Sequence, residues 1–161
     1  MLDKCWQNDS HEWKVSRFIK DPVEIKACWT TVQQNFVKLK DIFTSLIARS
    51  NFPNISINDF EIFSGTCQFF DKNVSLSTIG RLFISSNYEV VANDENPDRL
   101  LCRYEFFELL LRIANAKYRE TGLVSTFNEA FKKLLNENVF PNFEVSLWQE
   151  FRDHELWSYE V

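Results

Sequence analysis

Glycine, proline and histidine are scarce in this chain, and each scarcity argues against a class of protein. Three Gly and four Pro among 161 residues leave too few turn residues for the many connections of a β-sandwich. Only His11 and His154 are available for a His-based triad, and neither lies beside a plausible nucleophile. His11-Glu12 begins like a zinc-protease motif, but Val15 stands where the second His ligand belongs. We therefore expect no enzyme, no catalytic residues and no cofactor.

Cysteine pairs, long apolar runs and surplus basic charge are lacking as well. No apolar run is long enough to span a bilayer, and the first residues lack the basic and apolar blocks of a signal peptide. With 18 basic and 23 acidic residues the net charge is −5, which leaves no footprint for nucleic acid. We expect cytoplasmic residence, without membrane insertion and without a nucleic-acid partner. Four cysteines without CxxC spacing favour reduced, mostly buried thiols over a zinc site: Cys5, Cys28, Cys67 and Cys102.

Aromatic residues, by contrast, are abundant. Sixteen Phe and an apolar fraction of 45% predict a folded core built largely from rigid rings. A chain of this length fits one domain with a small appendage. We predict an N-terminal arm over residues 1–20 and a single helical domain over residues 21–161.

Helix start signals recur along the domain. Asp21 and Pro22 open a long helix, with Glu24 expected to complete a capping box, and the Gln33–Asn35 cluster is a point where this helix could divide. Later helices are expected after Ser56, after Ser75 or Ser77, through residues 105–120, after Ser125 or Thr126, and around Leu147, Trp148 and Phe151. Loops are expected at 90–100 and 136–142. The predicted fold class is all-α.

The layout repeats three times as a helix, a loop of about a dozen residues and a second helix. An apolar residue precedes each second helix: Ile55, Leu101 and Phe143. This arrangement resembles the EF-hand superfamily, with a pair of hands over about 36–119 and a partial third hand over about 125–158. The resemblance implies helix-loop-helix pairs with N- and C-terminal helical extensions.

The second loop carries the ligand types of a calcium site. With Glu105 at the twelfth loop position, Asp94, Asn96 and Asp98 fall at positions one, three and five, where calcium takes oxygen ligands. Position six is Arg99, although the sharp turn there needs a positive φ and favours Gly. Leu101 falls at position eight, where paired hands form a short β-bridge.

The other two loops depart further from a calcium site. The first has Ala48, Ser50 and Phe52 at positions one, three and five, with Asp59 at twelve. The third has Phe140 at five and Leu147 at twelve. We expect a hand-shaped scaffold that no longer binds ions, and a calcium-responsive regulator using the Asp94–Glu105 loop is the alternative.

A longer pattern is similar to a module of large ciliary and flagellar proteins of protists. It comprises Asn96-Pro97, Arg99, Leu101, Arg103-Tyr104, Phe106, Glu108, Leu110, Arg112-Ile113-Ala114 and Lys117-Tyr118. The resemblance implies a structural or docking role in the cytoskeleton of the cilium. The partners it implies are other axonemal proteins or tubulin.

Three further features have competing interpretations. Glu105 and Glu108 share a helix face and form either a carboxylate site or, as we expect, a helix start and a solvated or Arg112-paired side chain. The apolar residues from Phe106 to Ala114 surround their helix, which predicts either the central helix of the domain, as we expect for most of these residues, or a helix whose outer face meets another protein. Three tryptophans near the termini are either partner-binding residues or rings buried by folded-back ends: Trp6, Trp13 and Trp157.

Overall fold

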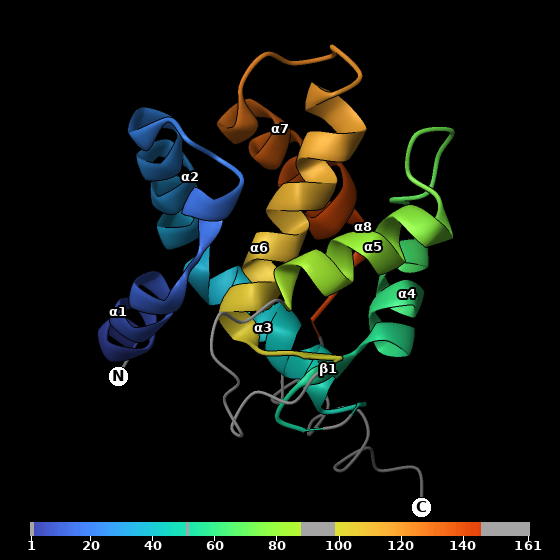
Figure 1. The fold of residues 1–161 in the computed structure, drawn as a ribbon. Coiled ribbons are helices and arrows are strands. Elements are labelled where there is room, and N and C mark those ends of the chain that lie inside the picture. Colours follow the sequence, from blue (N-terminus) through green and yellow to red (C-terminus); the bar gives the residue numbers. More distant parts are fainter. Residues whose placement is uncertain (1, 51, 88–98, 146–161) are drawn as a thin grey trace, which may run out of the picture.

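The computed structural model describes residues 2–50, 52–87 and 99–145, and these are almost entirely helical (Figure 1). This confirms the all-α class. The α-helices are α1 (Leu2–Glu12), α2 (Pro22–Gln34), α3 (Phe36–Ile47), α4 (Ile57–Thr66), α5 (Leu76–Ser86), α6 (Arg103–Ala114), α7 (Phe127–Leu134) and α8 (Phe140–Asn142). A 3₁₀ turn, η1, covers Val15–Arg17, and π-helical turns follow α6 (Asn115–Arg119) and α7 (Leu135–Val139). No helix of these ranges is long and apolar enough to cross a membrane.

The expected long helix is divided at Asn35 into α2 and α3. Asp21 caps α2 by accepting a hydrogen bond from the Val23 amide at 2.9 Å. The predicted capping box at Glu24 is wrong, because its carboxylate accepts instead from the Asn128 amide, 3.3 Å away at the start of α7. An orphan amide of α7 thereby gains its acceptor from another helix.

The other predicted caps are present. Ser56, Ser75 and Thr126 each accept a hydrogen bond from the amide three residues ahead, and Thr126 forms a capping box with Glu129. These bonds satisfy amides that the first helical turn leaves without partners.

The loop predicted for residues 136–142 is wrong. The chain stays helical from Phe127 to Asn142, through the π-helical turn into α8. Leu135 and Val139 are buried there, and Pro141 lies near the start of α8, within the last four residues of the helical run. A third hand would need a loop in this segment; its expected second helix, from Leu147, lies outside the described residues.

Helix α6 is the central element, as its apolar circumference predicts (Figure 1). Every residue from Glu105 to Leu111 is buried. The Phe106 ring lies within 6.1 Å, centroid to centroid, of rings from α3 and α4: Phe43, Phe60 and Phe63. Helices α3, α5 and α7 all contact α6, and the core is one continuous apolar cluster around it.

A two-stranded antiparallel sheet joins the two loops. Strands β1 (Ile55–Ser56) and β2 (Leu100–Leu101) pair Ile55 with Leu101, and both side chains are fully buried. This is the bridge expected at position eight of the two aligned loops. It holds the starts of α4 and α6 side by side.

Candidate functional site

The second loop meets α6 at Glu105, the one proposed calcium ligand among the described residues. Asp94, Asn96 and Asp98 lie outside them. The buried Glu105 carboxylate accepts from the Cys102 amide at 3.0 Å and from Cys102 Sγ at 3.2 Å. Asn87 Nδ2 also donates to it, at 3.4 Å. Glu105 therefore serves as the cap of its own helix.

Asn87, directly after α5, ties the two sides of this loop together. Its side-chain amide donates to Leu100 O at 2.9 Å, and its oxygen accepts from the Arg99 amide at 2.7 Å. Arg99 has a φ of +72°, the left-handed conformation that a calcium loop requires at this position. The left-handed turn therefore forms with arginine in place of glycine, and the Asn87 side chain stabilises it by hydrogen bonds.

The first loop is closed by hydroxyl groups. Ser50 Oγ and Ser56 Oγ both donate to the Asp59 carboxylate. Ser50 and Asp59 stand at loop positions three and twelve, which in a calcium loop would both contact the ion. Here the Ser50 hydroxyl contacts the Asp59 carboxylate directly. The described ranges contain no group of three or more metal-ligating side chains.

Glu105 and Glu108 do not form a solvent-facing carboxylate pair. Glu108 is 1% exposed and accepts from Arg112 Nε at 3.0 Å and Arg112 Nη2 at 2.8 Å. Arg17 Nη2, from η1, donates to the same oxygen at 3.2 Å. The predicted pairing with Arg112 is confirmed, and the solvated alternative is wrong, because η1 covers this side of α6 and brings a second arginine.

The N-terminal tryptophans pack against the chain's own aromatic rings. Trp13 is buried and stacked on Trp29 at 6.1 Å, while the half-buried Trp6 meets Trp29 edge to face at 6.2 Å and Phe36 at 5.6 Å. The residues of α1 thus lie against α2 and α3. Trp157 lies outside the described residues, as does Trp148.

An ion pair between the partly exposed Arg103 and the buried Asp9 joins α6 to α1. Arg103 Nε and Nη2 donate to the two oxygens of Asp9 at 2.5 and 3.0 Å. Burial raises the pKa of Asp9, and the hydrogen bond and charge of Arg103 offset part of that rise. No sequence pattern near either residue indicated this pair.

The end of α4 is held by side chains from the two π-helical turns. Gln68, with φ +57°, ends the helix, and the Phe69 amide donates back to Ser64 O at 3.0 Å. Asn138 Nδ2 then donates to Cys67 O at 3.1 Å and to Gln68 O at 3.2 Å.

Lys117 also holds the end of α4, and we call the contacts of Asn138 and Lys117 with this helix end the clamp. Its ammonium donates to Phe69 O at 3.1 Å and to Asp71 at 2.6 Å. Burial works to raise the pKa of Asp71, but hydrogen bonds from Lys117 and from the Asn73 and Val74 amides outweigh it, and the pKa is lowered. The cation also lies where the helix dipole is negative.

The cysteines are free thiols. Cys28 and Cys67 are buried, and burial raises the pKa of each to about 12. Burial and the neighbouring Glu105 carboxylate raise the pKa of Cys102 as well. Thiols of this kind are poor nucleophiles at neutral pH.

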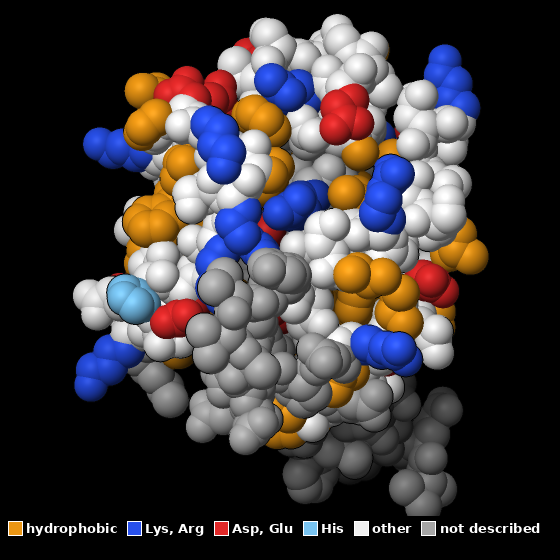
Figure 2. Space-filling view, viewed as in Figure 1, with side chains coloured by type: hydrophobic (Ala, Val, Ile, Leu, Met, Phe, Trp, Pro, Cys, Tyr) orange, Lys and Arg blue, Asp and Glu red, His pale blue; other side chains and the backbone are white. Residues whose placement is uncertain are grey.

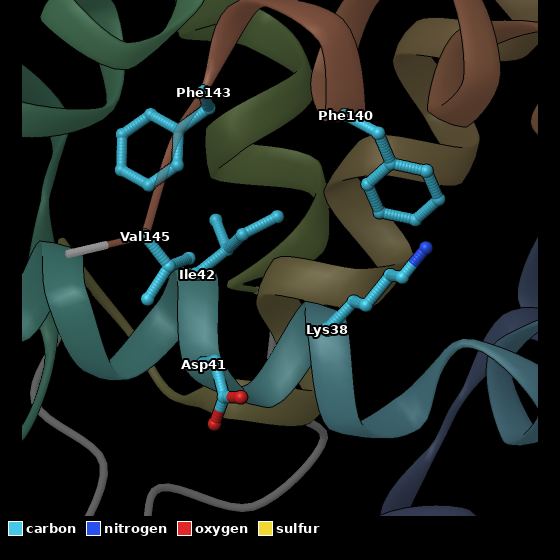
Figure 3. A pocket seen from close by; sticks show the side chains of 6 residues that line it. All are labelled: Lys38, Asp41, Ile42, Phe140, Phe143 and Val145. Atoms are coloured by element: carbon cyan, nitrogen blue, oxygen red, sulfur yellow. The ribbon is translucent and has the colours of Figure 1, made fainter. Parts of the chain in front are cut away.

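A shallow pocket of about 210 Å³ lies between α3 and the segment after α7 (Figure 3). Phe140, Phe143 and Ile42 form its apolar wall, and Lys38 Nζ lies 5.0 Å from the Phe140 ring centroid. The volume is below the roughly 300–1,000 Å³ of ordinary small-molecule sites. Lys38 and Asp41 are its charged lining residues, a set without a nucleophile and base pair.

Comparison of this chain with protein-family models, curated proteins and solved structures finds no match.

Proposed function

We propose that this chain is a non-enzymatic docking protein that holds partners within a larger assembly, the ciliary axoneme or its microtubules. The observation that carries the proposal is that the carboxylate at position twelve of each loop is bound by the protein's own groups. Asp59 is held by Ser50 and Ser56, and Glu105 by Cys102 and Asn87. These contacts tie the starts of α4 and α6 to neighbouring groups of the same chain, which supports a scaffold of constant shape.

The engagement of the buried carboxylates supports a structural role. Asp9 is bound to Arg103, Glu105 caps α6, and Glu108 is bound to two arginines. A general acid or base needs a carboxylate that faces a substrate pocket. The ciliary location rests on the resemblance of the 96–118 segment alone.

Cross-linking mass spectrometry on intact cilia tests the docking role. The expected result is recurrent cross-links from this chain to the same neighbouring axonemal proteins, retained after detergent extraction. Release of the chain with the soluble fraction, without a reproducible neighbour, would contradict the proposal.

The alternative, a calcium-responsive regulator, is favoured by one observation: Arg99 keeps the left-handed turn of a calcium loop. Calorimetric titration with Ca²⁺ separates the two functions. The docking proposal expects no binding heat, both for the natural chain and for Glu105→Gln. Heat that Glu105→Gln abolishes would instead establish the calcium site at Asp94, Asn96, Asp98 and Glu105.

A further inference from the structure

Apolar side chains at the surface of this molecule are of two kinds. On the face in Figure 2, hydrophobic side chains stand in separate groups among polar and charged ones, which is ordinary for a folded protein. The pocket between α3 and the segment after α7 differs, because its apolar residues surround a hollow (Figure 3). Ile42 there is 2% exposed, and the rings of Phe140 and Phe143 are half-buried. A hollow beside apolar groups loses dispersion contacts unless another group fills it.

The size of this pocket suits a single large side chain. Its volume is about 210 Å³. A cavity of about 150 Å³ lined by Leu, Ile and Phe side chains binds benzene, so the larger space can take the two fused rings of an indole. Drug-sized ligands and cofactors use more room, roughly 300–1,000 Å³. The space therefore fits one aromatic side chain better than a free ligand.

The chain itself brings such a side chain to the rim of the pocket. Val145 is a lining residue, and Trp148 follows it by three positions. Three residues span at most roughly 10 Å even when they are fully extended. The covalent connection therefore keeps the Trp148 backbone near the pocket and gives its indole a high effective concentration there.

The lining also matches an indole in its chemistry. Phe143 meets the Phe63 ring edge to face at 5.2 Å, so a further ring beside Phe143 would extend the aromatic core. A buried indole needs an acceptor for its N–H. The Asp41 carboxylate in the lining has lone pairs beyond its 2.7 Å contact with Lys40. The neighbouring Leu147 has neither the ring nor the donor.

We propose that Trp148 of the same chain occupies this pocket, between Phe140 and Phe143. Its indole continues the aromatic core over α3, and its N–H donates to Asp41. The pocket is then an internal packing site that is closed to a docking partner, so docking uses a different surface of the molecule. This inference is independent of the function proposed above, because packing of Trp148 within its own chain requires no partner.

Fluorine NMR of the full chain containing 5-fluorotryptophan tests the inference. The five tryptophans give five resonances, and Trp148→Phe identifies the one that belongs to Trp148. The resonance of an exposed fluorotryptophan shifts when water is replaced by D₂O, whereas that of a buried one stays in place. We expect no solvent shift for Trp148, at high and at low protein concentration alike.

Variants of the lining locate the ring. Phe140→Ala should shift the Trp148 resonance, and so should Lys38→Ala, which changes an exposed lining residue outside the core. Leu123→Ala is the matched control, because this 67% exposed side chain precedes α7, at the opposite end of the helical run that leads to Phe140. It should leave the Trp148 resonance unchanged. Far-UV circular dichroism verifies that each variant folds.

Three results would overturn the inference. A solvent shift as large as that of free 5-fluorotryptophan would place the Trp148 indole in water. An unchanged resonance in both Phe140→Ala and Lys38→Ala would show that the indole is buried at another site. A resonance that becomes solvent-sensitive on dilution would assign the pocket to Trp148 of a second copy. Each of these results leaves the cross-linking test of the docking function unaffected.

Discussion

At the scale of single residues, the most informative position is Arg99. The alignment to a calcium loop predicts a positive φ there, and the structure has it, with arginine in a conformation that favours glycine. A side chain with a Cβ in this conformation raises the free energy of the folded state by about 1 kcal/mol. The Asn87 hydrogen bond to the Arg99 amide helps to hold the turn.

We predict that Arg99→Gly raises the free energy of unfolding by about 0.5–1 kcal/mol, because the strain is relieved. Urea denaturation measures this value. Gly122→Ala is the opposite control. Gly122 has φ +78° with open space around it, so this change should lower the free energy of unfolding by about 1 kcal/mol. A loss of stability in Arg99→Gly would show that the arginine side chain contributes more than the strain.

Glu108 is the second residue whose replacement gives a large expected effect. Glu108→Gln leaves Arg17 and Arg112 facing a neutral amide at a buried site, so the free energy of unfolding should fall by about 3 kcal/mol. Glu137→Gln makes the same chemical change at an exposed pair, where Lys133 lies 2.6 Å away, and should change it by less than about 0.5 kcal/mol. Guanidinium denaturation distinguishes the two, and equal small losses would refute the structural role of Glu108.

At the scale of elements, the π-helical turns after α6 and α7 have a clear task. Each brings a polar side chain, Lys117 or Asn138, to the carbonyl groups at the end of α4. Turns of this type shift the register of a helix by one residue. The clamp therefore joins the end of α4 to two turns that lie 48 and 71 residues further along the sequence.

Acid should weaken this clamp. The lowered pKa of Asp71 means that the unfolded chain binds its proton more readily, so the stabilisation is present above the usual Asp pKa and is lost as the pH falls through the lowered folded value. Asp71→Asn should reduce stability by about 1 kcal/mol at neutral pH. The difference in free energy of unfolding between Asp71→Asn and the natural chain should become smaller as the pH falls. A difference that stays constant between neutral and strongly acidic pH would contradict this assignment.

At the scale of the whole molecule, α1 and η1, which belong to the segment predicted as an N-terminal arm, pack against the helices that follow. The Asp9–Arg103 pair and the Trp6, Trp13 and Trp29 cluster join α1 to α2, α3 and α6. The buried apolar residues form one contiguous cluster, whose first member in the sequence is Trp13 and whose last is Val139. A continuous core of this size favours one cooperative transition.

We therefore predict that the N-terminal tryptophan cluster unfolds together with the helices. In a Trp148→Phe, Trp157→Phe background, the fluorescence of Trp6, Trp13 and Trp29 should follow the same urea midpoint as far-UV circular dichroism. In Arg103→Met both midpoints should shift together to lower urea, because Asp9 loses its cation. Lys4→Met, at an exposed lysine of α1, should leave both midpoints unchanged. An earlier fluorescence transition in the natural chain would show an independent arm.

The sequence by itself determined the all-α class, the caps at Asp21 and Ser56, and the paired positions Ile55 and Leu101. It narrowed two further caps to a choice of two residues each, Ser75 or Ser77 and Ser125 or Thr126. These features depend on residue types a few positions apart, whose local geometry is nearly the same in any context. It also indicated the positive φ at Arg99 and the burial of α6.

Only the tertiary structure decided which partner each buried charge meets. Glu108 and Arg17 are 91 residues apart, and Asp9 and Arg103 are 94 apart. Such contacts depend on how helices pack, and short sequence patterns carry no record of that. The same reason explains the helical course of residues 136–142. Side chains that look like loop formers locally become helical where Asn138 can satisfy the end of α4 and Val139 can be buried.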